Sequence, residues 1–271
     1  MDLRTVGTVV NGFSEQAELF REEICRLLSA EGIRILTEET MNEGAAADVI
    51  LAFGGDGTIL KAAQYALRDS VPVLGLNFGR LGFLAEKVPE DPRTLADRLL
   101  KGTLREEERM ILQVGTGSGS PLFAVNDTVI SRGGYARLIS LEVRVNGNSA
   151  VKMLADGLVI ATPTGSTGYS ISAGGPIVSP DVNCMTVTPV CPHSLTQRPL
   201  VVSGASEITV TLGEDPYQAA VLQLDGQNRG IMKQNDSITV TQDTRKLRVL
   251  RLDDRNYYSL VRSKLSEWGT N

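Results

Sequence analysis

The chain has few of the side chains that build metal centres, disulfide frameworks or acyl-transfer sites. Its 271 residues include three cysteines and a single histidine, His193. An odd number of cysteines, none of them in a Cys-x-x-Cys pair, favours reduced thiols in a cytoplasmic protein and disfavours structural zinc. A single histidine also disfavours a serine-hydrolase triad. For His193 itself, a structural hydrogen-bonding role is the favoured interpretation.

Long hydrophobic runs and an excess of positive charge are absent as well. No segment approaches the roughly 20 apolar residues that span a bilayer, and residues 1–4 do not begin the apolar run of a signal peptide. The formal net charge is −5 at pH 7, which disfavours a nucleic-acid partner or attachment to an acidic membrane. The hydrophobic and charged fractions, 42% and 22%, are ordinary for a globular protein, and the length suits two domains.

Residues 1–103 alternate short apolar runs with amphipathic segments. Ser14 is a suitable N-cap for the first amphipathic segment, and Gly32 is a suitable terminator. The strands expected here are 5–10, 33–36, 48–53 and 71–76, and the helices are 14–31, 58–67 and 95–100. Repetition of strand, helix and strand predicts βαβ units, and therefore an α/β domain with a mostly parallel sheet.

The pattern changes after residue 103. Short apolar runs alternate with Asn-Gly, Asp-Gly and Ser-Gly pairs, and long helical periodicity is missing. We therefore expect a β-rich second domain over 104–252. The tail, 253–271, has apolar residues at helical spacing between Leu260 and Trp268. It is expected to form a helix that docks on the first domain.

The strongest local signal is an apolar strand that runs into a glycine-rich turn. The strand at 49–53 is followed by Gly54-Gly55-Asp56-Gly57 and then by a helical segment. Ligands of open α/β sheets bind at the carboxyl ends of the strands. Glycines let backbone N–H groups approach a phosphate closely, and a helix start adds a positive dipole end. The turn is therefore suited to a phosphate.

Asp56 needs an explanation, because a carboxylate repels an anion. It could hold a metal ion, or it could accept the proton of an attacking hydroxyl. The alternative is that Gly-Asp-Gly is ordinary turn chemistry, but the strand before it and the helix after it favour a function. Two common phosphate motifs do not fit, because the P-loop Gly-Lys-Ser/Thr is missing and Leu60 stands where the dinucleotide fingerprint needs glycine.

Two further loops follow apolar strands. The loop at 77–83, Asn-Phe-Gly-Arg-Leu-Gly-Phe, leaves the same sheet edge as the first turn and is expected to lie beside it. The stretch at 156–170 ends in a loop of hydroxyls, glycines and Tyr169. Hydroxyls and free N–H groups suit a ribose, an amide or a base edge, and Tyr169 can stack on a ring. An ordinary β-sandwich loop is the alternative.

Taken together, these stretches resemble the NAD kinase family over most of the chain. The residues that carry the resemblance are Gly54-Gly55-Asp56-Gly57-Thr58, Asn77-x-Gly79-Arg80-Leu81-Gly82-Phe83, Asn126-Asp127, Asp156-Gly157, Thr162-Pro163-Thr164-Gly165-Ser166-Thr167, Pro192-His193-Ser194-Leu195 and Leu224-Asp225-Gly226-Gln227. The first motif is shared with diacylglycerol and sphingosine kinases and, loosely, with phosphofructokinases. The combination with the loop at 162–167 is far more specific. Lipid kinases usually follow the glycine turn with Asn-Glu, where this chain has Leu60-Lys61.

The resemblance implies transfer of the terminal phosphoryl group of ATP to the 2′-hydroxyl of the adenosine ribose of NAD, giving NADP. Polyphosphate is an alternative donor. Mg²⁺ or a similar divalent ion is implied as cofactor, with no protein ligand assigned to it. Asp56 would be the base or orienting group for the hydroxyl, and Gly54, Gly55, Gly57 and Thr58 would bind the phosphates. Family members are commonly homodimers or homotetramers.

The resemblance also assigns contacts to NAD. Asn126 and Asp127 would hold ribose hydroxyls and adenine, although the family more often has Asn-Glu at these two positions. The full set expected to bind NAD is Gly57, Phe78, Asn126, Asp127, Asp156, Thr164, Thr167, Gly168, Tyr169 and Ser172, with Asp225 and Gln227 as further pocket candidates. A core role is equally open for Phe78, and Gly168 stands where the family frequently has alanine.

Two other functions stay open at this point. A lipid or sphingoid kinase would share the glycine turn, but the sequence shows no apolar acceptor pocket and no membrane affinity. A non-catalytic sensor that binds NADP would keep the fold, but the intact Asp56 argues against it.

Overall fold

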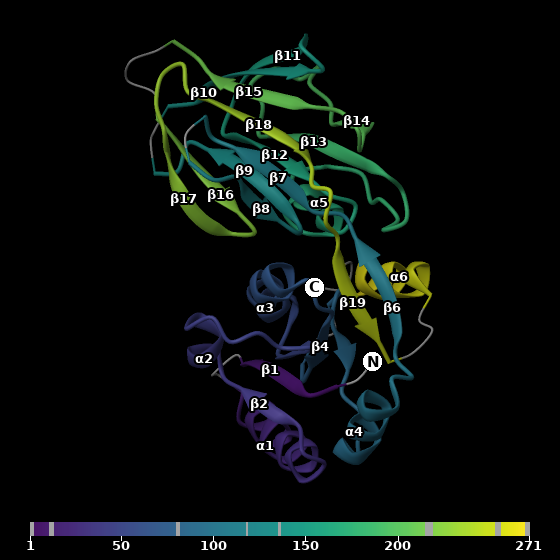
Figure 1. The fold of residues 1–271 in the computed structure, drawn as a ribbon. Helices are drawn as coiled ribbons and strands as arrows, with labels where there is room; N and C mark the ends of the chain where they lie inside the picture. The colour runs from purple at the N-terminus through teal and green to yellow at the C-terminus, as the bar shows by residue number, and fades with distance from the viewer. Residues whose placement is uncertain are drawn as a thin grey trace. The chain divides into compact units, whose positions relative to one another are not determined.

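The computed structural model describes residues 3–10, 14–79, 82–117, 119–134, 137–214, 219–252 and 256–268. The chain forms two units (Figure 1). The first unit combines Met1–Glu108 with Leu247–Asn271, and the second is Arg109–Lys246. Among the described residues, no helix is both long and apolar enough to cross a membrane.

The first unit is built on a mostly parallel sheet, which confirms the predicted fold class. Its strands are β1 (Thr5–Val10), β2 (Arg34–Leu36), β3 (Val49–Phe53), β4 (Val73–Asn77), β5 (Glu86–Lys87), β6 (Arg105–Arg109) and β19 (Leu247–Arg251). The order is β2-β1-β3-β4-β19-β6, and β5 pairs with β4. The pairs of β1 with β2 and β3, and of β4 with β3, β5 and β19, are parallel. Every residue of β3 and β4 is buried, as expected for a sheet covered on both faces.

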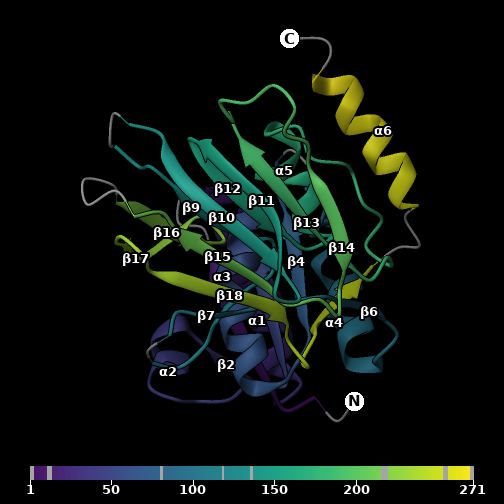
Figure 2. The ribbon, with the colours of Figure 1, turned by 90° about the horizontal axis from the view of Figure 1, so that it is seen from above.

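Helices cover both faces of this sheet. They are α1 (Glu15–Ala30), α2 (Glu38–Asn42), α3 (Asp56–Asp69) and α4 (Pro92–Lys101), and the last element of the chain is α6 (Tyr257–Trp268), yellow in Figures 1 and 2. Ser14 caps α1 as predicted, because its hydroxyl accepts the N–H of Ala17 at 3.2 Å. One core joins α1 and α4 to the sheet. On the opposite face, Gly75 leaves room for Ile59 of α3, since a Cβ there would lie 2.1 Å from that side chain.

Two strands of this sheet were expected elsewhere. The sequence placed 104–252 in the β-rich domain, but β6 and β19 belong to the sheet of the first unit. β6 reads Arg-Glu-Glu-Glu-Arg, so it has no apolar alternation that could assign it. β19 reads as an ordinary strand, and only its parallel pairing with β4, through Val249 and Val73, gives its place.

The second unit consists of two antiparallel sheets. Their orders are β11-β10-β15-β18-β7-β8 and β14-β13-β12-β9-β16-β17. The strands are β7 (Leu112–Gly115), β8 (Leu122–Ala124), β9 (Asp127–Ser131), β10 (Ile139–Val145), β11 (Asn148–Ala155), β12 (Gly157–Ala161), β13 (Cys184–Val190), β14 (Leu200–Ser203), β15 (Ile208–Leu212), β16 (Ala220–Leu224), β17 (Gln227–Met232) and β18 (Ser237–Gln242). Two predicted turn signals, Asn146-Gly147 and Asp225-Gly226, form two-residue hairpins with both φ angles positive, as type I′ turns require.

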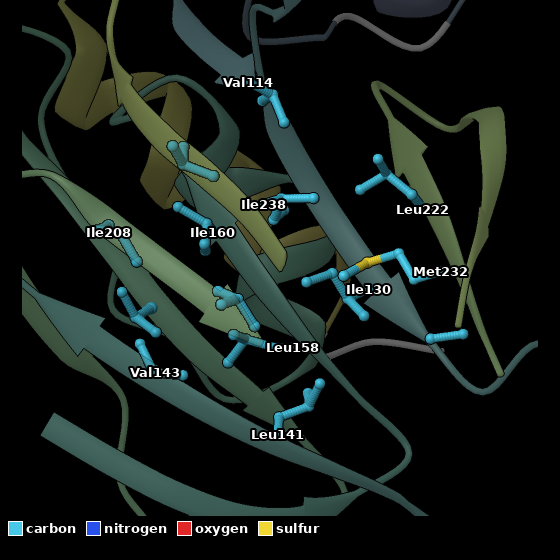
Figure 3. Packing of buried hydrophobic residues seen from close by; sticks show 14 of the residues in the cluster. Val114, Ile130, Leu141, Val143, Leu158, Ile160, Ile208, Leu222, Met232 and Ile238 are labelled. Atoms are coloured by element: carbon cyan, nitrogen blue, oxygen red, sulfur yellow. The ribbon is translucent and has the colours of Figure 1, made fainter. Parts of the chain in front are cut away.

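The two sheets of the second unit share one apolar core. Figure 3 shows Leu141 and Val143 of β10 gathered with Leu158 and Ile160 of β12 in this layer. The other face of the β12 sheet carries two short helices, η1 (Gly165–Thr167) and α5 (Tyr169–Ser172). Ser170 of α5 joins them to the sheet, since its hydroxyl lies 3.0 Å from that of Thr188.

Candidate active site

The glycine turn of the first unit joins β3 to α3 and leaves its backbone open at Gly55 and Gly57, whereas the N–H of Gly54 donates to the carbonyl of Leu76 at 2.8 Å. Gly54 has φ +156°, a region that side chains disfavour. Gly55 is the N-cap of α3 and makes no side-chain capping bond. The first N–H groups of a helix have no intrahelical acceptor and carry its positive dipole end. A Cβ at Gly55 or Gly57 would meet nothing within 4 Å, so an anion has room to approach these amides.

The carboxylate of Asp56 lies against the second loop. Its Oδ2 accepts the N–H of Phe83 at 2.8 Å, and its Oδ1 accepts those of Leu84 at 3.1 Å and Ala85 at 3.2 Å. A Cβ at Gly82 would lie 2.1 Å from Oδ1, so only glycine permits this approach. The predicted adjacency of the two loops is confirmed. The grip of Asp56 on three consecutive amides was not predicted.

The rest of the second loop divides between core and surface. Asn77 holds the turn, because its side-chain oxygen accepts the N–H of Gly79 at 2.8 Å. The ring of Phe78 is partly buried and packs edge-on against Phe20 with centroids 5.6 Å apart, at the edge of the core of the first unit. Of the two roles left open for Phe78, this packing supports the core role. Two residues of the motif, Arg80 and Leu81, lie outside the described residues.

In the second unit, the hydroxyl-rich loop folds onto Asn126. The Thr162 hydroxyl donates to the carbonyl of Val125 at 2.7 Å, and the N–H of Thr162 donates to that of Asn126 at 2.9 Å. A Cβ at Gly165 would lie 2.0 Å from the Asn126 carbonyl oxygen, which the motif alone did not reveal. The loop therefore depends on Gly165, for which the sequence pattern predicts no particular contact.

Three predicted NAD contacts come together at this loop. A Cβ at Gly168 would lie 3.7 Å from Oδ2 of Asp127 and 3.9 Å from the side-chain nitrogen, Nδ2, of Asn126. The Asn126 side-chain oxygen is buried and has no hydrogen-bond partner among the described residues. A buried acceptor of this kind is suited to a ligand that brings a donor.

Asp225 organises this site from the hairpin between β16 and β17. Its carboxylate accepts the N–H groups of Val125 at 2.8 Å, Asn126 at 2.7 Å and Asp127 at 3.2 Å. Burial is the main cause that raises the pKa of Asp225, and these amide hydrogen bonds oppose it. The sequence assigned Asp225 only to the pocket, and a local pattern cannot reveal bonds between residues about a hundred positions apart.

The pKa of Asp127 is raised to about 7, first by burial and second by the charge of Asp225. The carboxylate of Asp127 is therefore poised to change its charge near neutral pH. A group of this kind in a binding loop is a functional-site candidate.

The remaining predicted residues surround this loop or lie on the surface. Asp156 forms an ion pair with Arg132 at 2.6 Å. Thr164 is buried, and its carbonyl accepts the Thr167 hydroxyl at 3.1 Å. Tyr169, Ser172 and Gln227 are exposed, and Gln227 accepts a hydrogen bond from Arg229 at 2.7 Å. Within the described residues, no group of three His, Cys, Asp or Glu side chains could hold a metal ion.

The fold and these two loops define a class of protein. An open glycine turn at the start of a helix, on a parallel sheet, is suited to phosphate, and the aspartate in it is suited to accept a hydrogen bond from a hydroxyl. A second unit with a buried amide oxygen that has no partner among the described residues, and with a hydroxyl-rich loop, is suited to a nucleoside. These are the parts of a two-domain kinase that acts on a nucleotide.

Comparison with known proteins gives the particular family. Residues 42–104 match the ATP-NAD kinase N-terminal domain, and residues 125–252 match the ATP-NAD kinase C-terminal domain. The chain is 36% identical to an NAD kinase of Desulforamulus reducens, with 98% of both chains covered. It is 44% identical to an NAD kinase of Moorella thermoacetica, over 84% of this chain and 74% of that one.

Solved structures agree with this result. A yeast NADH kinase complexed with NADH is 25% identical, with a TM-score of 0.85, and the match covers 100% of this chain and 89% of that chain. An NAD kinase from Archaeoglobus fulgidus in complex with ATP is also 25% identical, with a TM-score of 0.75 and coverage of 97% and 98%. The chain belongs to the NAD kinase family and is an ATP-dependent phosphotransferase.

Proposed function

We propose that Asp56 is the catalytic residue in the transfer of the terminal phosphoryl group of ATP to the 2′-hydroxyl of the adenosine ribose of NAD. The observation that carries this proposal is the position of Asp56. It begins α3 in a turn whose backbone is open to an anion, and its carboxylate is held in one orientation by three amides. The names of the relatives, NAD kinase and NADH kinase, supply the substrate.

The hydrogen bonds of Asp56 favour an orienting role. A carboxylate has about four lone-pair directions, and the N–H groups of Phe83, Leu84 and Ala85 use three of them. The remaining direction is available to a hydroxyl. The carboxylate would then fix the attacking oxygen and accept its proton as the phosphoryl group arrives. Such a site works mainly by positioning and by charge neutralisation.

Phosphate binding falls to the turn itself. The amides of Gly55 and Gly57 and the hydroxyl of Thr58 are the groups that we assign to it. Gly54 was also expected to bind phosphate, but its N–H already donates to the carbonyl of Leu76 at 2.8 Å. Mg²⁺ prefers substrate phosphates and water to a protein cage, and the described residues offer no cluster of three ligands. We therefore assign the ion to the nucleotide phosphates, where it would neutralise their charge.

The second unit would bind NAD through the loop that folds onto Asn126. The side-chain oxygen of Asn126, which is buried and has no partner among the described residues, and the carboxylate of Asp127 are suited to accept hydrogen bonds from adenine or from ribose hydroxyls. Thr164, Thr167 and Gly168 would border the adenine, and Tyr169 would reach the nicotinamide end with Asp156 and Ser172. We also propose a homodimer or homotetramer, the states common in the family.

A substrate assay tests the proposal. Purified protein is given NAD, NADH or diacylglycerol in turn, with Mg²⁺ and either ATP or polyphosphate, and the phosphorylated product is identified. The expected result is NADP from NAD and ATP. Phosphorylated lipid would support a lipid kinase instead, and binding of NADP without turnover would support a sensor. If NADP forms with polyphosphate and not with ATP, polyphosphate is the donor.

A further inference from the structure

Arg251, near the end of β19, contacts the loop that holds Asp56. Its Nη1 donates to the carbonyl of Leu84 at 2.7 Å, and its Nη2 donates to that of Phe83 at 3.5 Å. Asp56 accepts the N–H groups of the same two residues. The backbone at 83–84 is therefore held from both sides, by Arg251 through its carbonyls and by Asp56 through its amides.

Two carboxylates fix the guanidinium of Arg251. Its Nη1 lies 2.9 Å from Glu86, and its Nε lies 2.9 Å from Glu107 of β6. The side chains of Arg251 and Glu86 are only 9% and 3% exposed, so this pair is removed from water. The planar guanidinium presents several donors in a rigid fork, which lets one side chain serve two carbonyls and two carboxylates. A lysine has no such fork.

From this geometry we infer that Arg251 is a positioning residue for phosphoryl transfer: it fixes the backbone at 83–84 and thereby the orientation of the Asp56 carboxylate. Arg251 itself touches no reacting atom. The inference rests on the proposed role of Asp56, and it adds a residue that is 195 positions away in the sequence and that no part of the motif pattern indicates.

The same strand supplies a matched control. Arg248 of β19 pairs with Glu106 of β6 at 2.5 Å, just as Arg251 pairs with Glu107 of that strand. Arg248 also donates to the carbonyl of Ser70 at 3.3 Å, so both arginines join an ion pair to a backbone contact. Of these two arginines, Arg251 contacts the loop that holds Asp56 and Arg248 does not.

The experiment compares Arg251→Lys, Arg251→Met and Arg248→Met in the full-length protein. Arg251→Met leaves Glu86 buried without its partner and is a risk to folding, so Arg251→Lys, which keeps the charge, is the decisive variant. Each variant is first checked by thermal unfolding. We expect Arg251→Lys to lower kcat about tenfold or more, since small misplacements of reacting groups can cost about 100-fold. The KM of Arg251→Lys for NAD should stay near the wild-type value. The kcat of the control, Arg248→Met, should also stay near the wild-type value.

Two further measurements separate positioning from general stability. Hydrogen exchange of a peptide spanning 82–87 should speed up in Arg251→Lys and not in Arg248→Met. The reason is that Arg251 no longer holds the carbonyls of Phe83 and Leu84, so the backbone whose amides bind Asp56 is less firmly fixed. In an Asp56→Asn background, Arg251→Lys should cause no further loss, since both changes act through one carboxylate. A folded Arg251→Lys with the kcat of Arg248→Met would overturn the inference. Normal turnover of Asp56→Asn alone would instead overturn the proposed role of Asp56.

Discussion

Asp225 and Asp127 exchange backbone and side-chain hydrogen bonds across about a hundred residues of chain. The Asp225 carboxylate accepts the N–H of Asp127 at 3.2 Å, and the N–H of Asp225 donates to the carbonyl of Asp127 at 3.0 Å. The buried carboxylate of Asp127 and the half-buried one of Asp225 are thereby brought into one site, and only that of Asp225 receives three backbone amides. Substitution by asparagine should therefore stabilise the protein at Asp127 and destabilise it at Asp225.

Asp127→Asn should stabilise the protein, and more so at high pH. The folded-state pKa of Asp127 is about 7 against an ordinary value of 3.8, so its ionisation opposes folding. That cost is absent below about pH 4, grows as the pH rises towards 7, and is constant above it. Urea unfolding at pH 5 and pH 8 measures the effect, which we expect to be on the order of 2–4 kcal/mol at pH 8. Equal gains at both pH values would contradict the assignment. NAD binding should weaken in the same variant.

Asp225→Asn should destabilise the protein. One oxygen of the carboxylate accepts from Val125 and the other accepts from Asn126 and Asp127. An asparagine keeps only one of these oxygens, so its NH₂ group would face at least one backbone N–H that has lost its acceptor. An unsatisfied buried donor costs about 1–3 kcal/mol, so we expect a loss of at least that size by urea unfolding. Asp236→Asn is the control, because Asp236 is exposed and accepts a single amide, that of Lys233. Similar losses in the two variants would show that the three bonds of Asp225 carry no special weight.

Asp56→Asn should lower kcat by about 100-fold to 10,000-fold, the usual contribution of a general base. NAD binding, measured by calorimetry, should remain near the wild-type value, because most of the proposed NAD contacts are in the second unit. Asp48→Asn is a matched control. Asp48 precedes the same strand, β3, and its carboxylate accepts the N–H groups of Arg4 and Thr5 at 2.9 and 2.7 Å. A similar loss of kcat in Asp48→Asn would point to a structural cause.

Gly82→Ala should lower turnover without changing any ionisable group. The added Cβ would lie 2.1 Å from Oδ1 of Asp56, so either the carboxylate or the loop must move. Gly79→Ala, in the same loop, meets only the side-chain oxygen of Asn77 at 3.8 Å, which is an ordinary contact. Steady-state kinetics should therefore show a large decrease in kcat for Gly82→Ala and a small one for Gly79→Ala. Equal kcat values for the two variants would show that the close approach of Gly82 to Asp56 does not affect turnover.

Gly165→Ala should disturb the proposed NAD loop. Its Cβ would lie 2.0 Å from the backbone oxygen of Asn126, which cannot turn away as a side chain can. Gly168→Ala is the comparison, since its closest contact is 3.3 Å, to the carbonyl oxygen of Gly165. We expect the KM for NAD to rise strongly in Gly165→Ala and little in Gly168→Ala. The reverse order would place NAD away from this loop.

Local signals in the sequence were sufficient for much of the fold. The buried runs at β3 and β4, the Ser14 cap and the Asn146-Gly147 turn are decided by neighbouring residues, and each is found where the pattern indicates. The adjacency of the two loops in the first unit also followed, because neighbouring parallel strands end at one edge of the sheet. These features depend on short stretches of chain.

Contacts between distant parts of the sequence could not be predicted in this way. The three amides held by Asp225 are 98 to 100 positions away from it, and Arg251 is 167 positions from Leu84. Nothing near Arg251 in the sequence distinguishes it from Arg245 and Arg248, a few positions before it. Phe78 shows the same limit, because a glycine-flanked phenylalanine is suited equally to a pocket and to a core.

The place of β19 in the sheet affects the order in which the protein can fold during synthesis. A ribosome makes β4 about 170 residues before β19, one of the strands that pair with it, so the whole second unit is made in between. Until Leu247–Arg251 emerges, β4 lacks its pairing with β19 at Val73, and the loop beside Asp56 lacks its arginine. A nascent or truncated chain that stops short of β19 would present an open strand edge, which favours aggregation. The loop beside Asp56 can therefore reach its final arrangement only after Leu247–Arg251 has been made.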